Sequence, residues 1–357
     1  MAYTDIDDPT AYFQTKIYSG NAGVQALTFD GNTDMQPDWV WLKKRNGAAN
    51  HHVIDSVRGA GVYLYPNLTN ADGGDGYDGG GNDLLSSFNS NGFTIDGGAD
   101  SNANGATGVA WSWKAGTSFS NDASSTSVGS VDSTGSVSTD AGFSIINVVK
   151  ANTTAHTVAH GLGAVPQMII GKSRTGGSYR WIVYHKDIGN THAQYLNETF
   201  VNTDSVTFWN DTTPTSSVFS LGTDNSWNGT NIFYCFAEKK GYSKIGTYIG
   251  NGNVDGTFVY TGFKPAFILQ KNTARAGSGW GMFDSTRTPT NVSKAMLIAN
   301  STAVEDTGNA PRVDFLSNGF KWRTTDNWFN DNGNVAIYIA FAENPFTTST
   351  AIPATAK

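Results

Sequence analysis

The chain has 357 residues, a formal net charge of −7 and a charged fraction of only 15%, where an ordinary soluble protein has about 25%. It contains 41 glycines, 12% aromatic residues and many β-branched residues between polar stretches. This composition favours an all-β chain with long loops. The length predicts two or three domains.

The same numbers exclude several classes of protein. An acidic chain lacks the positive charge that binds phosphate backbones, so we expect no nucleic-acid partner. The apolar run at 335–342 is far shorter than the ~20 residues that span a bilayer, so we expect no membrane insertion. The N-terminal residues are acidic, so no secretory signal is expected. A single cysteine, Cys235, excludes an internal disulfide framework and a Cys-rich zinc module.

Residues 1–116 form the first predicted unit. An apolar run follows Pro37, and proline marks a strand start or a sheet edge because it cannot donate to a ladder. Asn-Gly pairs supply the reversals between short strands. The landmarks, in chain order, are YSGN (18–21), DWVWLKK (38–44), HHVIDSVR (51–58), FNSNGF (88–93) and TGVAWSWK (107–114).

The segment 117–141 differs from its surroundings. It consists almost entirely of Ser, Thr, Gly, Asp and Val, a composition typical of a flexible connection between domains. We therefore predict a Ser/Gly-rich linker here.

The landmarks of the first unit return twice, in residues 142–242 and 243–357. Apolar strands follow Pro166 and Pro265, and the three prolines are 129 and 99 residues apart, so the surplus of about 30 residues in the first interval matches the predicted linker. Repeated landmarks predict three tandem copies with these prolines at equivalent strand starts. Units of about 100 residues with many short strands predict β-sandwiches of lectin or jelly-roll type.

Five stretches of these units are distinctive: GLGAVPQMIIGKSR (161–174), WIVYHKD (181–187), NIFYCFAEKKGYSKIGTYIGNG (231–252), VYTGFKPAFILQK (259–271) and, in the first unit, PDWVWLKKRNG (37–47). They closely resemble a repeated β-domain of tail-fibre-like and other virion proteins from marine tailed bacteriophages, including phages of cyanobacteria and pelagic bacteria. The resemblance implies a virion structural protein, made in the host cytoplasm, with no established catalytic residues and hence not an enzyme.

The expected role is host attachment through a tail fibre or spike that binds a host-surface glycan or receptor. Other virion proteins are the further expected partners. Small units bury a small fraction of their surface, and phage fibres commonly associate in threes, so we expect a homotrimer. The first alternative is a capsid-decoration, head-fibre or collar protein, which would bind empty capsids. The second is a polysaccharide depolymerase, which would release reducing sugar ends.

The acidic glycine-rich loop at 69–83 offers the one metal hypothesis and the one expected cofactor, Ca²⁺. It contains a single G-G-x-G-x-D sequence, which in tandem copies binds Ca²⁺ through carboxylate and carbonyl oxygens. A single copy lacks the second turn that completes the coordination, so a solvated loop is the competing interpretation. The carboxylates concerned are Asp72, Asp75, Asp78 and Asp83.

Two Asp-Ser-x-Arg sequences, at 55–58 and 284–287, could supply an acid and a cation for catalysis. They recur directly after a strand, where an aspartate that caps a turn and pairs with an arginine explains them better. His156 and His160 have an interval of four but lie on a predicted β segment, so we expect no metal site from them.

Aromatic residues in polar loops remain as candidates for sugar contact. The face of an indole stacks on the C–H face of a sugar, while neighbouring amides and carboxylates bind its hydroxyls. Trp209 has no counterpart in the other units and is the preferred candidate. Trp227 and Trp328 occupy matching positions in their units, which favours a packing role for both. The candidate glycan-binding residues are Trp209, Asn210, Trp227 and Trp328.

Overall fold

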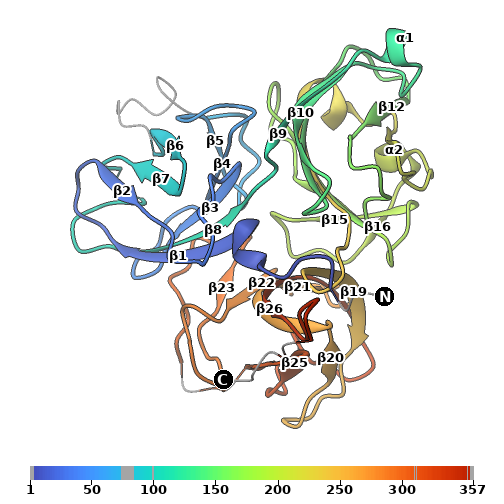
Figure 1. Cartoon of the computed structure of the whole chain (residues 1–357). Helices are drawn as coiled ribbons and strands as arrows, with labels where there is room; N and C mark the ends of the chain where they lie inside the picture. The colour runs from blue at the N-terminus through green and yellow to red at the C-terminus, as the bar shows by residue number, and fades with distance from the viewer. Residues whose placement is uncertain are drawn as a thin grey trace.

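Short apolar runs separated by turns fold into antiparallel sheets, which confirms the all-β prediction. The computed structural model describes residues 4–73, 84–98, 100–308, 310, 312–351 and 353. In this part of the chain there are three large and three small sheets. Figure 1 shows them as three lobes around a common centre, coloured blue, green to yellow, and orange to red. No helix among the described residues is long and apolar enough to cross a membrane.

The first lobe is built on a five-stranded sheet of order β1-β8-β3-β4-β5, against which lies a small sheet β2-β7-β6. A one-turn 3-10 helix, η1 (Pro9–Ala11), is capped by Asp8 and precedes the sheet. The strands are β1 (Phe13–Ser19), β2 (Gln25–Leu27), β3 (Trp39–Lys44), β4 (His52–Asp55), β5 (Tyr63–Leu64), β6 (Ser87–Asn89), β7 (Gly92–Ile95) and β8 (Thr107–Trp113).

The second lobe has an eight-stranded sheet, β16-β15-β14-β13-β18-β11-β10-β9, and a small sheet β12-β17. Its short helices are α1 (Ala123–Thr126), α2 (Val206–Trp209) and η2 (Asn225–Trp227). The strands are β9 (Thr117–Asn121), β10 (Ser133–Ser138), β11 (Phe143–Lys150), β12 (His156–Ala159), β13 (Met168–Ser173), β14 (Ile182–His185), β15 (His192–Tyr195), β16 (Thr203–Asp204), β17 (Val218–Leu221) and β18 (Gly229–Phe236).

The third lobe repeats the order of the first, with a five-stranded sheet β19-β26-β21-β22-β23 and a small sheet β20-β25-β24. Its strands are β19 (Ser243–Ile249), β20 (Phe258–Tyr260), β21 (Phe263–Asn272), β22 (Gly281–Asp284), β23 (Leu297–Ile298), β24 (Val313–Leu316), β25 (Gly319–Trp322) and β26 (Val335–Pro345).

The predicted linker at 117–141 is the main correction to the sequence analysis. The segment forms β9, α1 and β10, and β10 pairs antiparallel with β11 over six residues. Gly135 lies so close to the Ile145 carbonyl oxygen that a Cβ there would be 1.9 Å from it. Ser, Thr and Gly are typical of flexible linkers, but here they belong to strands at the outer edge of a sheet, where side chains need not be apolar.

The three prolines mark corresponding places, although not always a strand start. Pro37 and Pro166 lie two residues before β3 and β13, whereas Pro265 lies inside β21 at a shift in its register with β26. In each case the residue two positions later pairs with an aromatic residue of the neighbouring long strand. These pairs are Trp39–Trp113, Met168–Phe236 and Phe267–Phe341.

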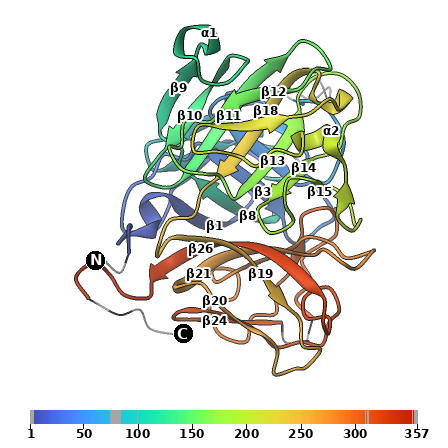
Figure 2. The same ribbon diagram turned by 90° about the vertical axis from the view of Figure 1, so that its right-hand side faces the viewer.

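The inner faces of the three large sheets meet in one apolar core. The ring of Trp39 in the first sheet stacks on Tyr234 of the second at 4.5 Å between centroids, and Phe13 stacks on Phe341 of the third at 5.4 Å. Phe236 and Phe341 close the remaining contact at 5.9 Å. Figure 2 shows how the third sheet lies across the other two.

The outer face of each large sheet forms a second core with its own small sheet. The homotrimer expectation assumed three separate and modest cores. That premise is wrong for this chain, because the three sheets already share a core within one polypeptide. Threefold packing is therefore achieved inside the chain, and a homotrimer stays a prediction without that argument.

Direct hydrogen bonds also join neighbouring lobes. The indole Nε1 of Trp181, just before β14, donates to the carbonyl of Tyr65 in the first lobe at 2.9 Å. In the same way Trp280, just before β22, donates to the carbonyl of Tyr195 in the second lobe at 2.8 Å. Because each indole is buried, its N–H needs this partner.

We predict that the whole chain unfolds in one transition, because the lobes share a core. Far-UV circular dichroism and tryptophan fluorescence should give coincident urea curves. Trp39→Ala should lower the free energy of unfolding by roughly 3–5 kcal/mol, as for other buried aromatic side chains, and shift both curves together. Separate transitions, or a loss confined to one of them, would contradict the shared core.

Candidate functional site

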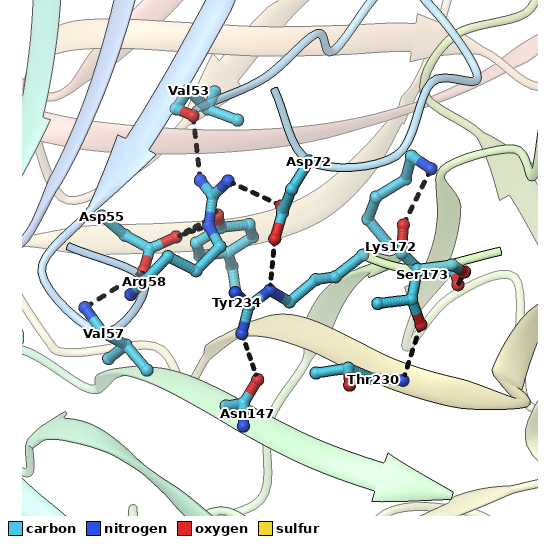
Figure 3. Close-up of polar contacts among 12 residues, drawn as sticks. Val53, Asp55, Val57, Arg58, Asp72, Asn147, Lys172, Ser173, Thr230 and Tyr234 are labelled. Atoms are coloured by element: carbon cyan, nitrogen blue, oxygen red, sulfur yellow. Dashed lines mark hydrogen bonds and ion pairs between the residues drawn. The ribbon is translucent and has the colours of Figure 1, made fainter. Parts of the chain in front are cut away.

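The first Asp-Ser-x-Arg sequence forms a buried network between the first two lobes, shown in Figure 3. Arg58 Nε donates to Asp55 Oδ2 at 2.6 Å, and both side chains are fully buried. The Tyr234 hydroxyl of the second lobe donates to the same oxygen at 2.7 Å. Asp72 accepts from Arg58 at 3.2 Å and from Arg174 at 2.7 Å. A carboxylate and a guanidinium so enclosed serve the junction rather than a substrate.

The second sequence repeats this arrangement between the first and third lobes. Arg287 donates to Asp284 and, at 2.7 Å, to Glu305, while the indole N–H of Trp111 donates to Asp284 at 2.9 Å. Both arrangements agree with the structural interpretation of these motifs.

The second lobe has His185 where the others have these aspartates, opposite Met168 in the register. The strand position that carries Tyr234 in β18 and Trp111 in β8 carries Ile339 in β26, which has no donor. Burial lowers the pKa of His185 to about 4, so it is neutral at pH 7. An aspartate is therefore present at the two junctions where the neighbouring lobe supplies a hydrogen-bond donor. The neutral His185 is present at the junction where the facing strand position has no donor.

Three buried lysines lie at corresponding positions, six residues after the three prolines. Burial lowers the pKa of Lys43, Lys172 and Lys271 to about 8 each. Lys172 donates to the Thr69 carbonyl of the first lobe at 3.1 Å, and Lys43 donates to the Thr302 carbonyl of the third. A lysine with a lowered pKa can be a catalytic base, but these three are at most 1% exposed and closed to a substrate.

The Ca²⁺ hypothesis rests on residues that fall largely outside the described part of the chain, since Asp75, Asp78 and Asp83 all do. Asp72 is described, and two arginines already neutralise it. Among the described residues no group of three or more His, Cys, Asp or Glu could hold a metal ion.

The prediction that the ring of Trp209 stacks on a sugar is wrong. Its ring is 1% exposed and packs on Trp227 at 5.6 Å and on Tyr184 at 5.9 Å. Trp227 is fully buried, and its indole N–H donates to the Phe208 carbonyl at 2.9 Å. Neither ring offers a free face. Asn210 is exposed but has φ +54° at the end of α2, where it terminates the helix.

Trp328 is half-buried and packs beside Phe329 at 6.4 Å. The expected match between Trp227 and Trp328 is off by one residue. The N–H of Trp227 donates to the Asp224 carbonyl, and that of Phe329 donates to the Asp326 carbonyl. Phe329 is therefore the counterpart of Trp227, and Trp328 is the more exposed residue before it.

The loops that carry Trp209 and Trp227 nevertheless border a pocket in the second lobe, which we call the Arg180 pocket. Its volume is about 260 Å³. Phe208 of α2 and Ser226 of η2 form part of its wall, and each is next in sequence to one of the buried tryptophans. The other lining residues used below are Tyr179, Arg180, Tyr195, Glu198 and Asp224.

Arg180 is held at the mouth of this pocket in a fixed orientation. Its guanidinium lies over the ring of Tyr195 at 5.2 Å and over that of Phe200 at 5.4 Å. Its Nε donates to Glu198 Oε1 at 3.2 Å, and the side chain remains 48% exposed. A planar guanidinium with unused N–H groups beside aromatic rings is suited to binding vicinal hydroxyls or an acidic sugar.

The two carboxylates of the pocket are already engaged by the protein. Asp224 accepts from the N–H of Ser226 at 2.8 Å, capping η2, and from the hydroxyl of Thr207 at 3.3 Å. Glu198 accepts from Arg180 and from the Asn197 amide at 3.2 Å. A glycosidase needs one carboxyl to donate a proton and the other to attack or to activate water, and these two are instead used to shape the wall.

The sequence analysis missed Tyr179 and Arg180, although a signal for them exists. Both follow the turn at Gly176-Gly177 in a polar loop, the context in which aromatic residues were judged as sugar contacts. A tyrosine ring can stack on a sugar as an indole does, and Tyr179 lines the pocket.

A family profile described as "Domain of unknown function (DUF7483)" matches residues 8–345. The match covers nearly the whole chain and all three lobes. Searches of curated proteins and of solved structures found no match.

The buried lysines predict that stability rises between about pH 8 and 10. In this range the unfolded chain, with ordinary lysine pKa values near 10.5, binds more protons than the folded chain, so raising the pH favours folding. The gain should be on the order of 1–2 kcal/mol per lysine. Urea unfolding at pH 7.5, 8.5 and 9.5 measures it. The triple variant Lys43→Met, Lys172→Met, Lys271→Met should flatten this dependence, and an unchanged slope would contradict the assignment.

Proposed function

The chain belongs to the DUF7483 family, and we propose for it the role of a non-enzymatic virion protein of a tailed phage. It acts as a tail-fibre or spike adhesin that binds a host-surface glycan in the Arg180 pocket. The phage origin rests on the resemblance of the sequence to virion β-domains. The glycan-binding role rests on the pocket.

The architecture we propose for it is three tandem β-sandwich units. Its support is the strand order, since β1-β8-β3-β4-β5 and β19-β26-β21-β22-β23 place their elements in the same succession. The middle of the eight-stranded sheet, β11-β18-β13-β14-β15, has that succession too. Each large sheet also packs on a small one, as the layers of a sandwich do.

The observation that carries the glycan proposal is the combination of an exposed, oriented arginine with aromatic and hydroxyl side chains in one concave site. Sugar sites combine ring faces with a few directed polar groups. Prior engagement of Glu198 and Asp224 favours binding over hydrolysis, and so favours an adhesin over a depolymerase.

We predict that Arg180→Ala and Tyr179→Ala each weaken binding roughly 10- to 100-fold, as expected for anchors of a recognition site. The measurement is binding of the purified chain to an array of bacterial lipopolysaccharide and capsular oligosaccharides, followed by titration against the best ligand. Both side chains lie at the surface of the pocket, so the variants should keep the wild-type melting temperature.

A matched control is Arg275→Ala, which removes another exposed arginine from an ion pair, with Asp331 at 3.3 Å in the third lobe. Binding by this variant should equal that of the wild type. Equal loss in Arg180→Ala and Arg275→Ala, with no loss in the uncharged Tyr179→Ala, would point to a charge effect rather than a pocket. Release of reducing ends would favour the depolymerase, and binding to empty capsids without glycan binding would favour capsid decoration.

A further inference from the structure

In the second lobe, a segment of the chain covers the open side between the large sheet and the small sheet. Along the large sheet, Ser136 and Thr134 of β10 lie opposite Ile145 and Asn147 of β11. Along the small sheet, the N–H of Ser130 donates to the carbonyl of Thr157 in β12 at 2.8 Å. The segment 117–138 thus follows both sheet edges at once.

This covering segment also supplies apolar side chains to the gap. Val137 is buried in the core of the second lobe, and Phe119 and Val131 pack against that core. Between them stand Ser and Thr residues. The segment that seals this edge is therefore a hydroxyl-rich strand with widely spaced apolar residues.

The strand β19 of the third lobe corresponds to β11 of the second. Phe143 of β11 lies opposite Phe236 at the end of β18, and Ser243 of β19 lies opposite Phe341 near the end of β26. Four residues further along, Thr247 takes the place of Asn147. In the described part of the chain β19 pairs only with β26, and no strand covers its other edge.

The hydrogen bonds at the two ends of β19 show which residues face outward. The Tyr242 carbonyl accepts from the N–H of Ala342, and the N–H of Gly250 donates to the Asn334 carbonyl. Because these bonds alternate along an antiparallel pair, the backbone of Thr247 points away from β26. Its N–H and carbonyl have no hydrogen-bond partner among the described residues.

A groove of about 570 Å³ runs between β19 and β20, at the place that 117–138 fills in the second lobe. Large apolar side chains are left exposed there, with Ile249 at 58%, Phe258 at 43% and Tyr260 at 60%. An uncovered edge strand beside exposed aromatic groups is a template for pairing with another chain.

We propose that the edge of β19 binds an extended polypeptide strand of a partner protein, antiparallel to β19 and centred on Thr247. The partner strand is rich in hydroxyl residues with widely spaced apolar residues, as the segment 117–138 is, so that its backbone pairs with Thr247 and its apolar side chains cover Phe258 and Tyr260. This mode is β-augmentation, in which main-chain bonds give affinity and side-chain pockets give specificity. The site lies in a different lobe from the Arg180 pocket.

The corresponding edge of β1 in the first lobe has backbone contacts of the same kind. Gln25 donates to the carbonyl of Ser19 at 3.2 Å, as the Thr257 hydroxyl donates to the carbonyl of Ile249 on β19 at 2.7 Å. The edge of β1 differs in the loop that follows it, since Lys16 forms an ion pair with Asp30 at 2.6 Å and Gln14 accepts from the N–H of Gly31 at 2.9 Å. We therefore use β1 as the matched control.

The test uses a synthetic peptide of residues 129–140, GSVDSTGSVSTD, titrated into the full chain by fluorescence anisotropy. We expect saturable binding and slower hydrogen exchange at the amides of Thr247 and Ile249. Thr247→Pro should weaken binding at least 10-fold, because proline removes the outward N–H while leaving the bonds to β26 in place. Ile17→Pro, at the corresponding place on β1, should leave binding unchanged.

A second variant without proline separates a loss of binding from a loss of folding. Phe258→Glu places a charge on an exposed groove residue and should weaken binding by a similar factor. Its control is Val304→Glu, at an exposed apolar residue (50%) outside the groove, which should leave binding unchanged. Absence of binding, or protection that appears at 143–147 because the peptide displaces β10, would overturn the proposal. Thr247→Pro should keep glycan binding and Arg180→Ala should keep peptide binding, so the two proposals fail separately.

Discussion

The packing of three aromatic-rich sheet faces against one another is the interaction on which the rest of this structure depends. Trp39 on Tyr234, Phe13 on Phe341 and Phe236 on Phe341 each join two lobes. Burial of such large rings contributes a large share of the packing energy of a core, and here it joins all three lobes. Because the inner faces are used in this way, the surfaces that stay accessible are the outer surfaces and the sheet edges.

Buried polar contacts then fix how the lobes are arranged around this core. Apolar packing is not directional, so it cannot by itself select one register between sheets. The indole donors of Trp181 and Trp280 and the two Asp-Arg pairs are directional and costly to leave unpaired. At the third junction the neutral His185 takes the place of the aspartates. The facing strand position holds Ile339, whose side chain has no donor for a carboxylate.

The open sides of the lobes are where the chain differs from one lobe to the next. In the second lobe the insertion 117–138 seals the sheet edge, whereas α2 and η2 help to build the Arg180 pocket. In the third lobe no strand of the described residues pairs with the corresponding edge, and the exposed apolar groups remain beside it. Differences of this kind give the chain a pocket in one lobe and an open sheet edge in another, the two places where we propose that partners bind.

The strand content and the corresponding prolines could be predicted from the sequence, because apolar periodicity, proline and Asn-Gly turns act over a few residues. The sequence also indicated that Asp55 and Asp284 pair locally with Arg58 and Arg287, since such pairs span only three positions. It could not show that Trp209 and Trp227 are buried, because a tryptophan in a polar loop has the same neighbours in sequence whether its ring faces solvent or a core. Nor could it show that 117–141 is a pair of strands, since Ser, Thr and Gly form a strand only where another edge accepts their backbone groups. These points became visible in the folded chain alone, because each depends on partners that lie far away along the chain.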